Sequence, residues 1–157
     1  ESKNITVEKD FAHTLLTVML DRQQIKQVLL NLLINAMEAM GDRGGRLAVR
    51  TRQLSKPGGD LWVQIEVSDT GPGIAPADLD HIFDPFYTTK HHSEEREGTG
   101  LGLTIVHQIV QEHHGYIEVE SHPSRGTTFF VNVPIRQPDD LFARERMEHE
   151  KTDPVGR

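Results

Sequence analysis

The stretch RQQIKQVLLNLLINAMEAM, residues 22–40, decides what kind of fold this chain can adopt. Its apolar residues recur at intervals of three and four, which is the spacing of one buried face of an α-helix. Asp21 stands where a helix N-cap belongs, and glycines at positions 41, 44 and 45 follow the last apolar residue. The pattern therefore predicts a long amphipathic helix over residues 22–40. Its apolar positions are Ile25, Val28, Leu29, Leu32, Leu33, Ala36, Met37 and Met40.

Segments that favour strands lie on both sides of this helix. Two alternating segments, LAVRTRQL and LWVQIEVSD, are separated by the turn-rich SKPGGD and predict a hairpin. YIEVES and TTFFVNVP predict a second strand pair, joined by HPSRG. Strands are also expected at residues 5–9 and 15–20, before the helix. Together these elements predict an α+β fold, with helices packed on one face of a mixed sheet.

Two shorter helices and two polar regions complete the pattern. We expect a helix at residues 75–83 and another at 101–114, the latter ended by Gly115 as its C-cap. Residues 84–99 are predicted to be an exposed loop. The charged residues after Pro134 are expected to be weakly structured, so the predicted division is a folded domain over 1–136 and a flexible tail over 137–157.

Composition excludes several function classes. The chain of 157 residues has no cysteine, so disulfides and thiolate chemistry are excluded. A net charge of -7 argues against binding to nucleic acid. No apolar run approaches the roughly 18 residues of a membrane span, so no membrane contact is expected. Because the sequence starts without methionine or a targeting segment, we expect a piece of a longer protein.

The glycine-rich stretch GTGLGL, residues 98–103, leads into the second predicted helix. It does not fit the P-loop pattern, which requires a lysine at the start of the helix, and the strand that should precede a dinucleotide fingerprint is missing. Glycines and a helix N-terminus can nevertheless hold a phosphate with backbone N–H groups. A phosphate-binding loop is the favoured interpretation of this stretch, and a flexible hinge is the alternative.

Two further segments favour ligand binding. In VSDTGPGI, residues 67–74, a strand delivers Asp69 at its end, and Gly71 and Gly73 let the chain turn close to a ligand. An aspartate in this position could also be an ordinary turn former. Asn31 and Asn35 lie four residues apart, so they share one face of the long helix. Asparagine is unfavourable inside a helix and needs polar partners or water there.

In this order, NLLINAMEA, DTGPGI, FDPF and GTGLGL resemble the N, G1, F and G2 boxes of the catalytic domain of sensor histidine kinases, in the superfamily that includes gyrase B, MutL and the large heat-shock chaperone. The resemblance runs from about residue 5 to residue 134 and looks most like the nitrogen-regulator type. It implies the Bergerat ATP-binding fold, a two-layer α/β sandwich with a mixed, mainly antiparallel sheet and three main helices on one face.

The resemblance also implies the site. Asp69 would accept a hydrogen bond from the adenine amino group, with Thr127 assisting through water, and Asn35 would bind Mg²⁺. Asn31 would support the phosphates, and Lys90 would contact them from a lid over residues 86–99. The residues expected to bind ATP are Asn31, Asn35, Asp69, Gly71, Gly73, Ile74, Phe86, Tyr87, Lys90, Gly98, Thr99, Gly100, Leu101, Gly102, Leu103 and Thr127; those expected to act in catalysis are Asn31, Asn35 and Lys90.

The residue at position 31 also distinguishes a kinase from an ATP hydrolase in this superfamily. The ATPases of this superfamily carry a water-activating glutamate at that position, and asparagine cannot act as a base. The resemblance therefore implies transfer of the γ-phosphoryl group to a histidine. Many relatives carry a basic residue where this chain has Glu38, so a phosphate contact from that position is not expected. Phe83 is expected in the core, and His91 and His92 are expected to be solvated.

The resemblance implies two partners, the histidine-containing dimerisation domain of the same full-length protein and a downstream response regulator. The domain itself is expected to be monomeric and cytoplasmic, within a membrane-anchored or soluble sensor. HEKTDP, residues 149–154, matches the phosphoacceptor pattern but lies on the wrong side of the domain, so we expect no phosphorylation there. The alternatives are a serine kinase of the kind that binds sigma factors, or a nucleotide-binding module without transfer activity.

Overall fold

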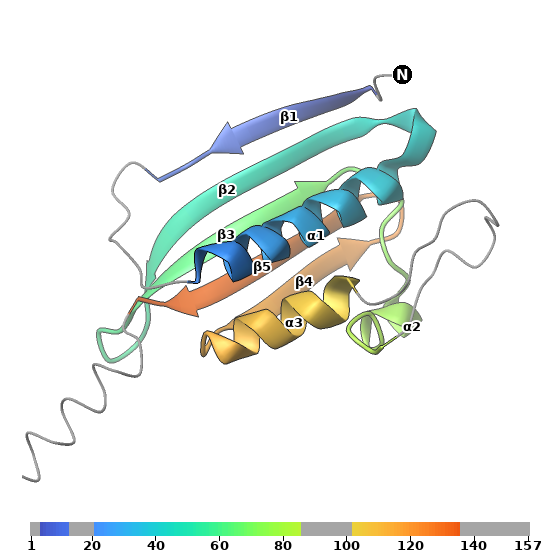
Figure 1. Cartoon of the computed structure of the whole chain (residues 1–157). Coiled ribbons are helices and arrows are strands. Elements are labelled where there is room, and N and C mark those ends of the chain that lie inside the picture. Colours follow the sequence, from blue (N-terminus) through green and yellow to red (C-terminus); the bar gives the residue numbers. More distant parts are fainter. Residues whose placement is uncertain (1–3, 13–20, 86–101, 136–157) are drawn as a thin grey trace, which may run out of the picture.

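The computed structural model describes residues 4–12, 21–85 and 102–135. Within these residues, helices lie on one face of a five-stranded sheet (Figure 1). The sheet order is β1-β2-β3-β5-β4, with β1 parallel to β2 and every other neighbouring pair antiparallel. The elements are β1 (Ile5–Asp10), α1 (Arg22–Met40), a 3-10 turn (Gly41–Arg43), β2 (Gly45–Ser55), β3 (Leu61–Asp69), α2 (Pro76–Leu79), α3 (Gly102–Glu112), β4 (Tyr116–His122) and β5 (Gly126–Pro134). The predicted fold class is confirmed.

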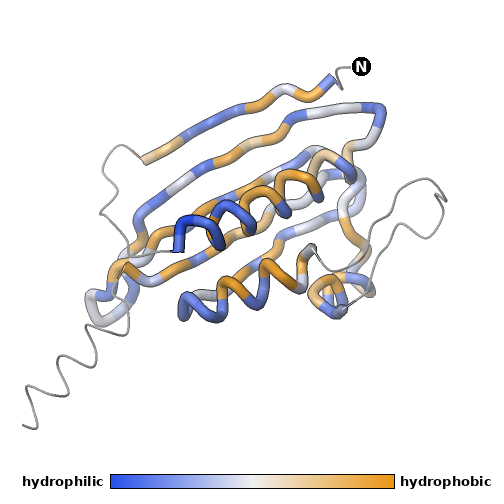
Figure 2. Tube along the Cα trace, viewed as in Figure 1, coloured by the Kyte–Doolittle hydropathy of each residue, from blue (hydrophilic) through white to orange (hydrophobic). Residues whose placement is uncertain are grey.

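Helix α1 starts and ends as its sequence predicts. The Asp21 side chain accepts hydrogen bonds from the backbone N–H groups of Gln23 and Gln24, so it caps the helix. Gly41 follows with a positive φ of 57°, and its N–H donates to Met37. In Figure 2 the first turn of α1 is hydrophilic and hydrophobic residues prevail further along. The helix therefore packs on the sheet with the apolar face that its spacing defines.

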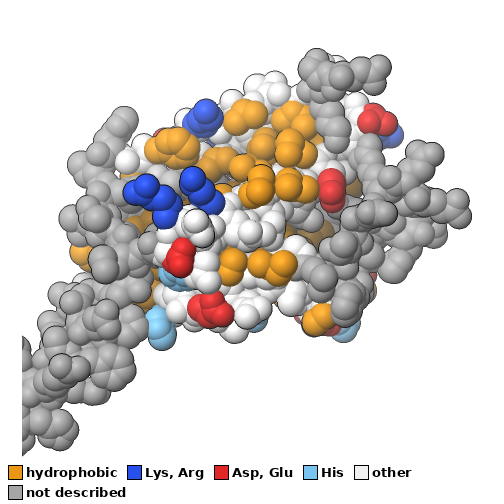
Figure 3. All heavy atoms as spheres, viewed as in Figure 1, with side chains coloured by type: hydrophobic (Ala, Val, Ile, Leu, Met, Phe, Trp, Pro, Cys, Tyr) orange, Lys and Arg blue, Asp and Glu red, His pale blue; other side chains and the backbone are white. Residues whose placement is uncertain are grey.

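The core lies between the helices and the inner face of the sheet. Odd-numbered residues of β3 and β5 point inward, as the period of two in a strand requires. Large hydrophobic side chains are also exposed, and some gather on the face that Figure 3 shows. The buried core consists of Val28, Leu32, Ala36, Met40, Leu47, Val63, Ile65, Val67, Ile82, Val106, Ile109, Val110, Phe129, Val131 and Val133. In the part of the chain that the structure describes, the exposed large hydrophobic residues are Val7, Phe11, Leu30, Ile34 and Ile105.

A buried histidine connects the two main helices. The Nδ1 atom of His113 lies 2.8 Å from the carbonyl oxygen of Ile109, which can only accept, so Nδ1 donates. Its Nε2 atom then accepts the backbone N–H of Asp21 at 3.2 Å. The side chain thereby links the end of α3 to the cap of α1.

Three predicted boundaries were wrong. The helix expected at residues 75–83 is helical only over Pro76–Leu79 and continues as turns. The helix expected at 101–114 covers Gly102–Glu112 among the described residues. The left-handed residue after it is His114, with φ of 59°, rather than Gly115. Gly115 is needed for another reason: a Cβ there would lie 2.1 Å from the carbonyl oxygen of Asn132 in β5.

Other predictions fall outside the described residues. They include the strand at 15–20, most of the loop at 84–99, and the tail from 136 onward. The division into 1–136 and 137–157 stays a prediction. No described helix is long and apolar enough to cross a membrane.

Candidate functional site

Asp69 is the last residue of β3 and points to the inner, helix-covered face of the sheet. It is only 4% exposed, and its Oδ1 accepts the backbone N–H of Gly71 at 2.8 Å. Burial raises the pKa of Asp69 above 3.8, although backbone N–H donation from Gly71 and Thr127 partly opposes this shift. Within the described part of the chain, no cation forms an ion pair with this carboxylate. Asp69 is therefore a buried acceptor with lone pairs left for a ligand.

Thr127 lies opposite Asp69 on the neighbouring strand. The two residues are register partners in the antiparallel pair β3–β5, so their side chains share the inner face. Thr127 is 5% exposed, and its Oγ1 lies 2.8 Å from Oγ of Ser121 on β4. The structure thus brings together the two residues that the sequence assigned to the base end of the site.

The glycines of DTGPGI lie against the protein's own backbone. A Cβ on Gly71 would lie 2.9 Å from the Asp69 carboxylate and 3.3 Å from the backbone of Ala39 in α1. Gly73 has φ of +78°, and a Cβ there would lie 2.2 Å from the carbonyl oxygen of His122. The next residue, Ile74, donates its N–H to Oγ of Ser121 at 2.7 Å. The packing of the turn itself leaves little room for a Cβ at either glycine. That the two glycines also let the chain turn close to a ligand stays a prediction.

Asn31 and Asn35 lie on successive turns of α1. Nδ2 of Asn31 donates to the carbonyl oxygen of Gly102, the first residue of α3, at 3.2 Å. This bond orients the Asn31 amide, and its oxygen has no hydrogen-bond partner among the described residues. At 1.5 Å per residue, Asn31 and Ala39 are about 12 Å apart along the helix, with Asn35 midway. The candidate site thus extends along α1 from the asparagines to the Asp69 turn.

The first residues of α3 have distinct environments. Among the described residues, nothing lies within 4 Å of a Cβ built on Gly102. Leu103 packs against the core. Thr104 donates its hydroxyl to the carbonyl oxygen of Phe83 at 2.9 Å, and the Phe83 ring lies 5.3 Å from that of His107. Phe83 packs against the core as expected.

Asn35 fits the role of a magnesium ligand by its chemistry. It is half-buried, and no hydrogen bond occupies its amide among the described residues. Mg²⁺ takes oxygen ligands, keeps several waters and needs few protein groups. No cluster of three or more histidine, cysteine, aspartate or glutamate side chains that could hold a metal occurs in the described ranges. Any Mg²⁺ here would depend mainly on amide and phosphate oxygens.

Several predicted site residues lie outside the described residues, so their positions stay predictions. His91 and His92, which were expected to be solvated, also lie outside the described residues. The predicted ligand-binding residues concerned are Phe86, Tyr87, Lys90, Gly98, Thr99, Gly100 and Leu101.

Sequence reasoning missed Ser121 and Gly126. Ser121 is 8% exposed and contacts Ile74, Gly126 and Thr127. Gly126 has φ of +92°, and a Cβ there would lie 2.0 Å from the carbonyl oxygen of Asp69. A signal for Ser121 was present, because it follows Ile117 and Val119 on the inward phase of β4, where an apolar residue is expected.

This combination of a helix-covered mixed sheet, a buried aspartate at the end of its central strand and paired asparagines on the covering helix is that of a nucleotide-binding domain. Residues 20–137 match the family described as histidine kinase-, DNA gyrase B-, and HSP90-like ATPase, and the chain belongs to that family. The resemblance found in the sequence motifs is therefore confirmed.

Two similar curated proteins are named sensor kinases. The chain is 41% identical over 134 residues to sensor histidine kinase ZraS of Escherichia coli, covering 85% of this chain and 26% of that protein. It is 38% identical over 173 residues to sensor kinase CckA of Brucella abortus, covering 98% of this chain and 18% of the relative. The chain thus spans about a quarter or less of the length of these two proteins.

Solved structures of histidine kinases have a similar fold. The nucleotide-free catalytic domain of histidine kinase ThkA matches with a TM-score of 0.69 and 35% identity, covering 85% of this chain and 82% of that one. Full-length ShkA in complex with AMPPNP matches with a TM-score of 0.71 and 29% identity, covering 86% of this chain and 26% of that one. The fold is that of histidine kinase catalytic domains.

Proposed function

We propose that this domain binds Mg-ATP and transfers its γ-phosphoryl group to a histidine on a separate dimerisation domain of the same full-length protein. The observation that carries the proposal is Asp69. A buried carboxylate without a cationic partner is unfavourable unless hydrogen-bond donors satisfy it. Two backbone N–H groups meet part of this need, and the adenine amino group supplies a further donor.

The asparagines support the phosphate end of the proposed site. The amide oxygens of Asn31 and Asn35 face no competing donor among the described residues, and oxygen ligands suit Mg²⁺. When bound, the ion neutralises phosphate charge. Asn31 holds the start of α3 through Gly102, and the N–H groups there are suited to phosphate oxygens. Lys90 and the glycines before α3 complete this end of the proposed site.

Phosphoryl transfer depends mainly on positioning and charge neutralisation. Neither asparagine can take a proton from water, so the domain should hold ATP for an incoming imidazole. Hydrolysis by the domain alone should be slow. A fast wild-type ATPase would contradict the kinase assignment.

The partners follow from this assignment. We propose that the acceptor histidine belongs to a helical hairpin and that a response regulator receives the phosphoryl group next. The names of the relatives, sensor kinases several times longer than this chain, support such an arrangement. We propose that this catalytic domain acts in the cytoplasm.

Phosphorylation in trans tests the proposal. A histidine hairpin is supplied with labelled ATP and with the wild-type domain, Asp69→Asn or Asn35→Asp. We expect both variants to reduce transfer, Asp69→Asn through weaker ATP binding and Asn35→Asp through an altered magnesium site. The label should be lost in acid, as expected of a phosphoramidate. Acid-stable label would favour the serine-kinase alternative, and undiminished transfer by both variants would refute the site.

A further inference from the structure

We propose that Ser121 is a positioning residue, which fixes the hydroxyl of Thr127 as an acceptor and thereby sets the preference of the site for an amino-bearing purine. This inference rests on the proposed ATP site and assigns its base selectivity to a residue outside the predicted site. Ser121 lies on β4, a strand to which the sequence assigned no site residue.

Three polar groups surround Oγ of Ser121. The N–H of Ile74 lies 2.7 Å away, Oγ1 of Thr127 2.8 Å away, and the carbonyl oxygen of Gly126 3.1 Å away. The side chain is 8% exposed, so water does not readily replace these partners. Ser121 therefore links the turn after β3 to the start of β5.

Counting protons fixes the direction of each bond. The Ile74 N–H can only donate and the Gly126 carbonyl can only accept, so Ser121 gives its one proton to Gly126. Thr127 must then donate its own proton to Ser121. If Ser121 donated to Thr127 instead, its oxygen would face the Gly126 carbonyl oxygen without a proton between them. Only the first arrangement makes all three contacts hydrogen bonds.

The consequence reaches the proposed base edge. With its proton committed to Ser121, Thr127 offers only lone pairs beside Asp69, which is also an acceptor. An edge made of two acceptors suits a ligand group that donates, such as the adenine amino group or a water that bridges to it. A purine with a carbonyl oxygen in that position meets acceptors only. Ser121 would thus enforce the preference for an amino-bearing purine through Thr127, without itself contacting the ligand.

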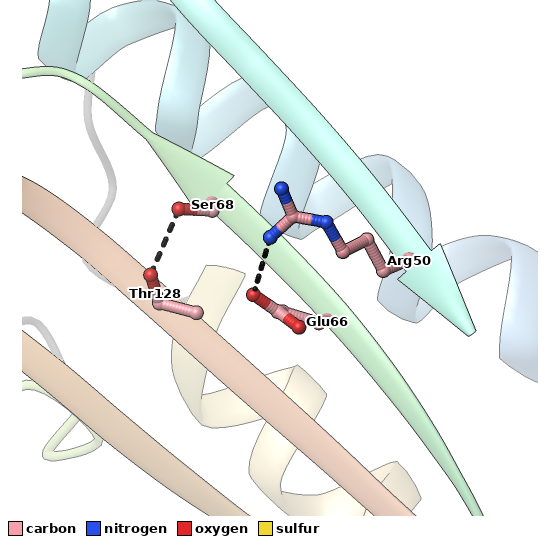
Figure 4. A network of polar contacts seen from close by, with 4 residues as sticks. All are labelled: Arg50, Glu66, Ser68 and Thr128. Carbon is pink, nitrogen blue, oxygen red and sulfur yellow. Dashed lines mark hydrogen bonds and ion pairs between the residues drawn. The ribbon is translucent and has the colours of Figure 1, made fainter. Parts of the chain in front are cut away.

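The chain provides a control in a second hydroxyl pair. Ser68 in β3 and Thr128 in β5, the sequence neighbours of Asp69 and Thr127, also lie 2.8 Å apart between their hydroxyl oxygens. This pair lies on the opposite face of the sheet from Asp69 and Thr127, near Arg50 and Glu66 (Figure 4). Ser68→Ala removes the same kind of hydrogen bond without reaching the proposed site.

The experiment measures dissociation constants of Mg-ATP and Mg-ITP for the wild-type domain, Ser121→Ala, Ser121→Thr and Ser68→Ala. Ser121→Ala frees the Thr127 proton to turn toward the base edge. We expect ATP binding to weaken roughly 2- to 12-fold, the loss of about one hydrogen bond, while ITP binding is unchanged or tighter. Ser121→Thr should restore the ATP preference, and Ser68→Ala should keep it.

A double-mutant cycle with Thr127→Val separates positioning of the Thr127 hydroxyl from a purely structural role of Ser121. If Ser121 acts through Thr127, Ser121→Ala should change the ratio of the Mg-ITP and Mg-ATP dissociation constants in the wild-type background. In the Thr127→Val background the same substitution should leave that ratio unchanged. An unchanged ratio in folded Ser121→Ala would refute the inference. If that variant does not fold, a wild-type ratio in Thr127→Val would refute it equally. Failure of the wild-type domain to bind ATP would instead refute the proposed function.

Discussion

At the scale of single residues, Asp69 combines a proposed role in binding adenine with a cost in stability. Burial raises its pKa, so the folded state binds this proton more tightly than the unfolded state does. The resulting stabilisation is complete below the usual carboxyl value of 3.8 and is lost as the pH rises through the raised pKa. Above the raised pKa the charged side chain therefore makes the ligand-free domain less stable than the protonated side chain does.

Asp69→Asn should separate these two effects. The amide imitates the protonated carboxyl, so we expect the ligand-free variant to melt above the wild type at pH 7, with the difference shrinking toward pH 4. ATP binding should weaken roughly ten- to hundredfold, since a charged acceptor contributes about 1.5 to 3 kcal/mol. Thermal unfolding across pH and nucleotide titration measure both quantities. A lower melting temperature at pH 7 would show that the carboxylate is stabilising.

Asn31 offers a second test at this scale, because its amide donates to Gly102 and is proposed to stand where related ATPases carry a water-activating base. Asn31→Glu should raise ATP hydrolysis by providing a water-activating carboxylate. It should also lose the bond to α3, lowering stability by about 0.5 to 1.5 kcal/mol. In Asn31→Gln the new side chain has nearly the same shape as the glutamate but carries no basic oxygen, so this variant serves as the control. Equal hydrolysis by both variants would exclude the base interpretation.

At the scale of elements, the two glycine motifs differ in what they require. Gly73 has a left-handed backbone and no room for a Cβ, whereas no described atom lies within 4 Å of a Cβ built on Gly102. Gly73→Ala should therefore lower the free energy of unfolding by about 1 to 3 kcal/mol or more, as expected for backbone strain. Gly102→Ala should leave stability unchanged or slightly higher, because alanine favours helix. Chemical denaturation of both variants measures this, and equal losses would contradict the distinction.

The strands show how far the sequence predicts the site. The inward positions of β3, β4 and β5 are apolar except at one end of each strand, where Asp69, Ser121 and Thr127 lie. Each change is visible in the sequence, and the alternation correctly predicted all three strands. Their meeting at one end of the sheet depends on the order β3-β5-β4, which local pattern does not specify. Ser121 therefore looked like an ordinary strand end until the pairing placed it beside Thr127.

The helices show a different limit. Spacing predicted α1 well, because its capping aspartate and terminal glycine act locally. The link from Asn31 to Gly102 joins residues 71 positions apart and could not be derived from either helix alone. Likewise, the requirement for Gly115 comes from the close approach of β5, so a local C-cap rule gave the wrong reason for it.

At the scale of the whole molecule, the proposed site joins both layers of the fold. Asp69 and Thr127 belong to the sheet, Asn31 and Asn35 to α1, and Gly102 to α3. A ligand that spans these elements stabilises the folded state by mass action, by about 2.7 kcal/mol at one hundred times its dissociation constant. For a domain of this size, that corresponds to roughly 5–10 °C in melting temperature.

We therefore expect Mg-ATP to raise the melting temperature by this amount and Mg-GTP at the same concentration to raise it much less. Because Asn35 is proposed to act through the metal, ATP with a chelator should give a smaller shift in the wild type. Asn35→Ala should show little further dependence on Mg²⁺, whereas Ser68→Ala should behave as the wild type. Differential scanning fluorimetry with each nucleotide, with and without Mg²⁺, makes the comparison. Equal shifts with ATP and GTP would contradict adenine recognition by Asp69, and equal shifts with and without Mg²⁺ would remove the metal from the site.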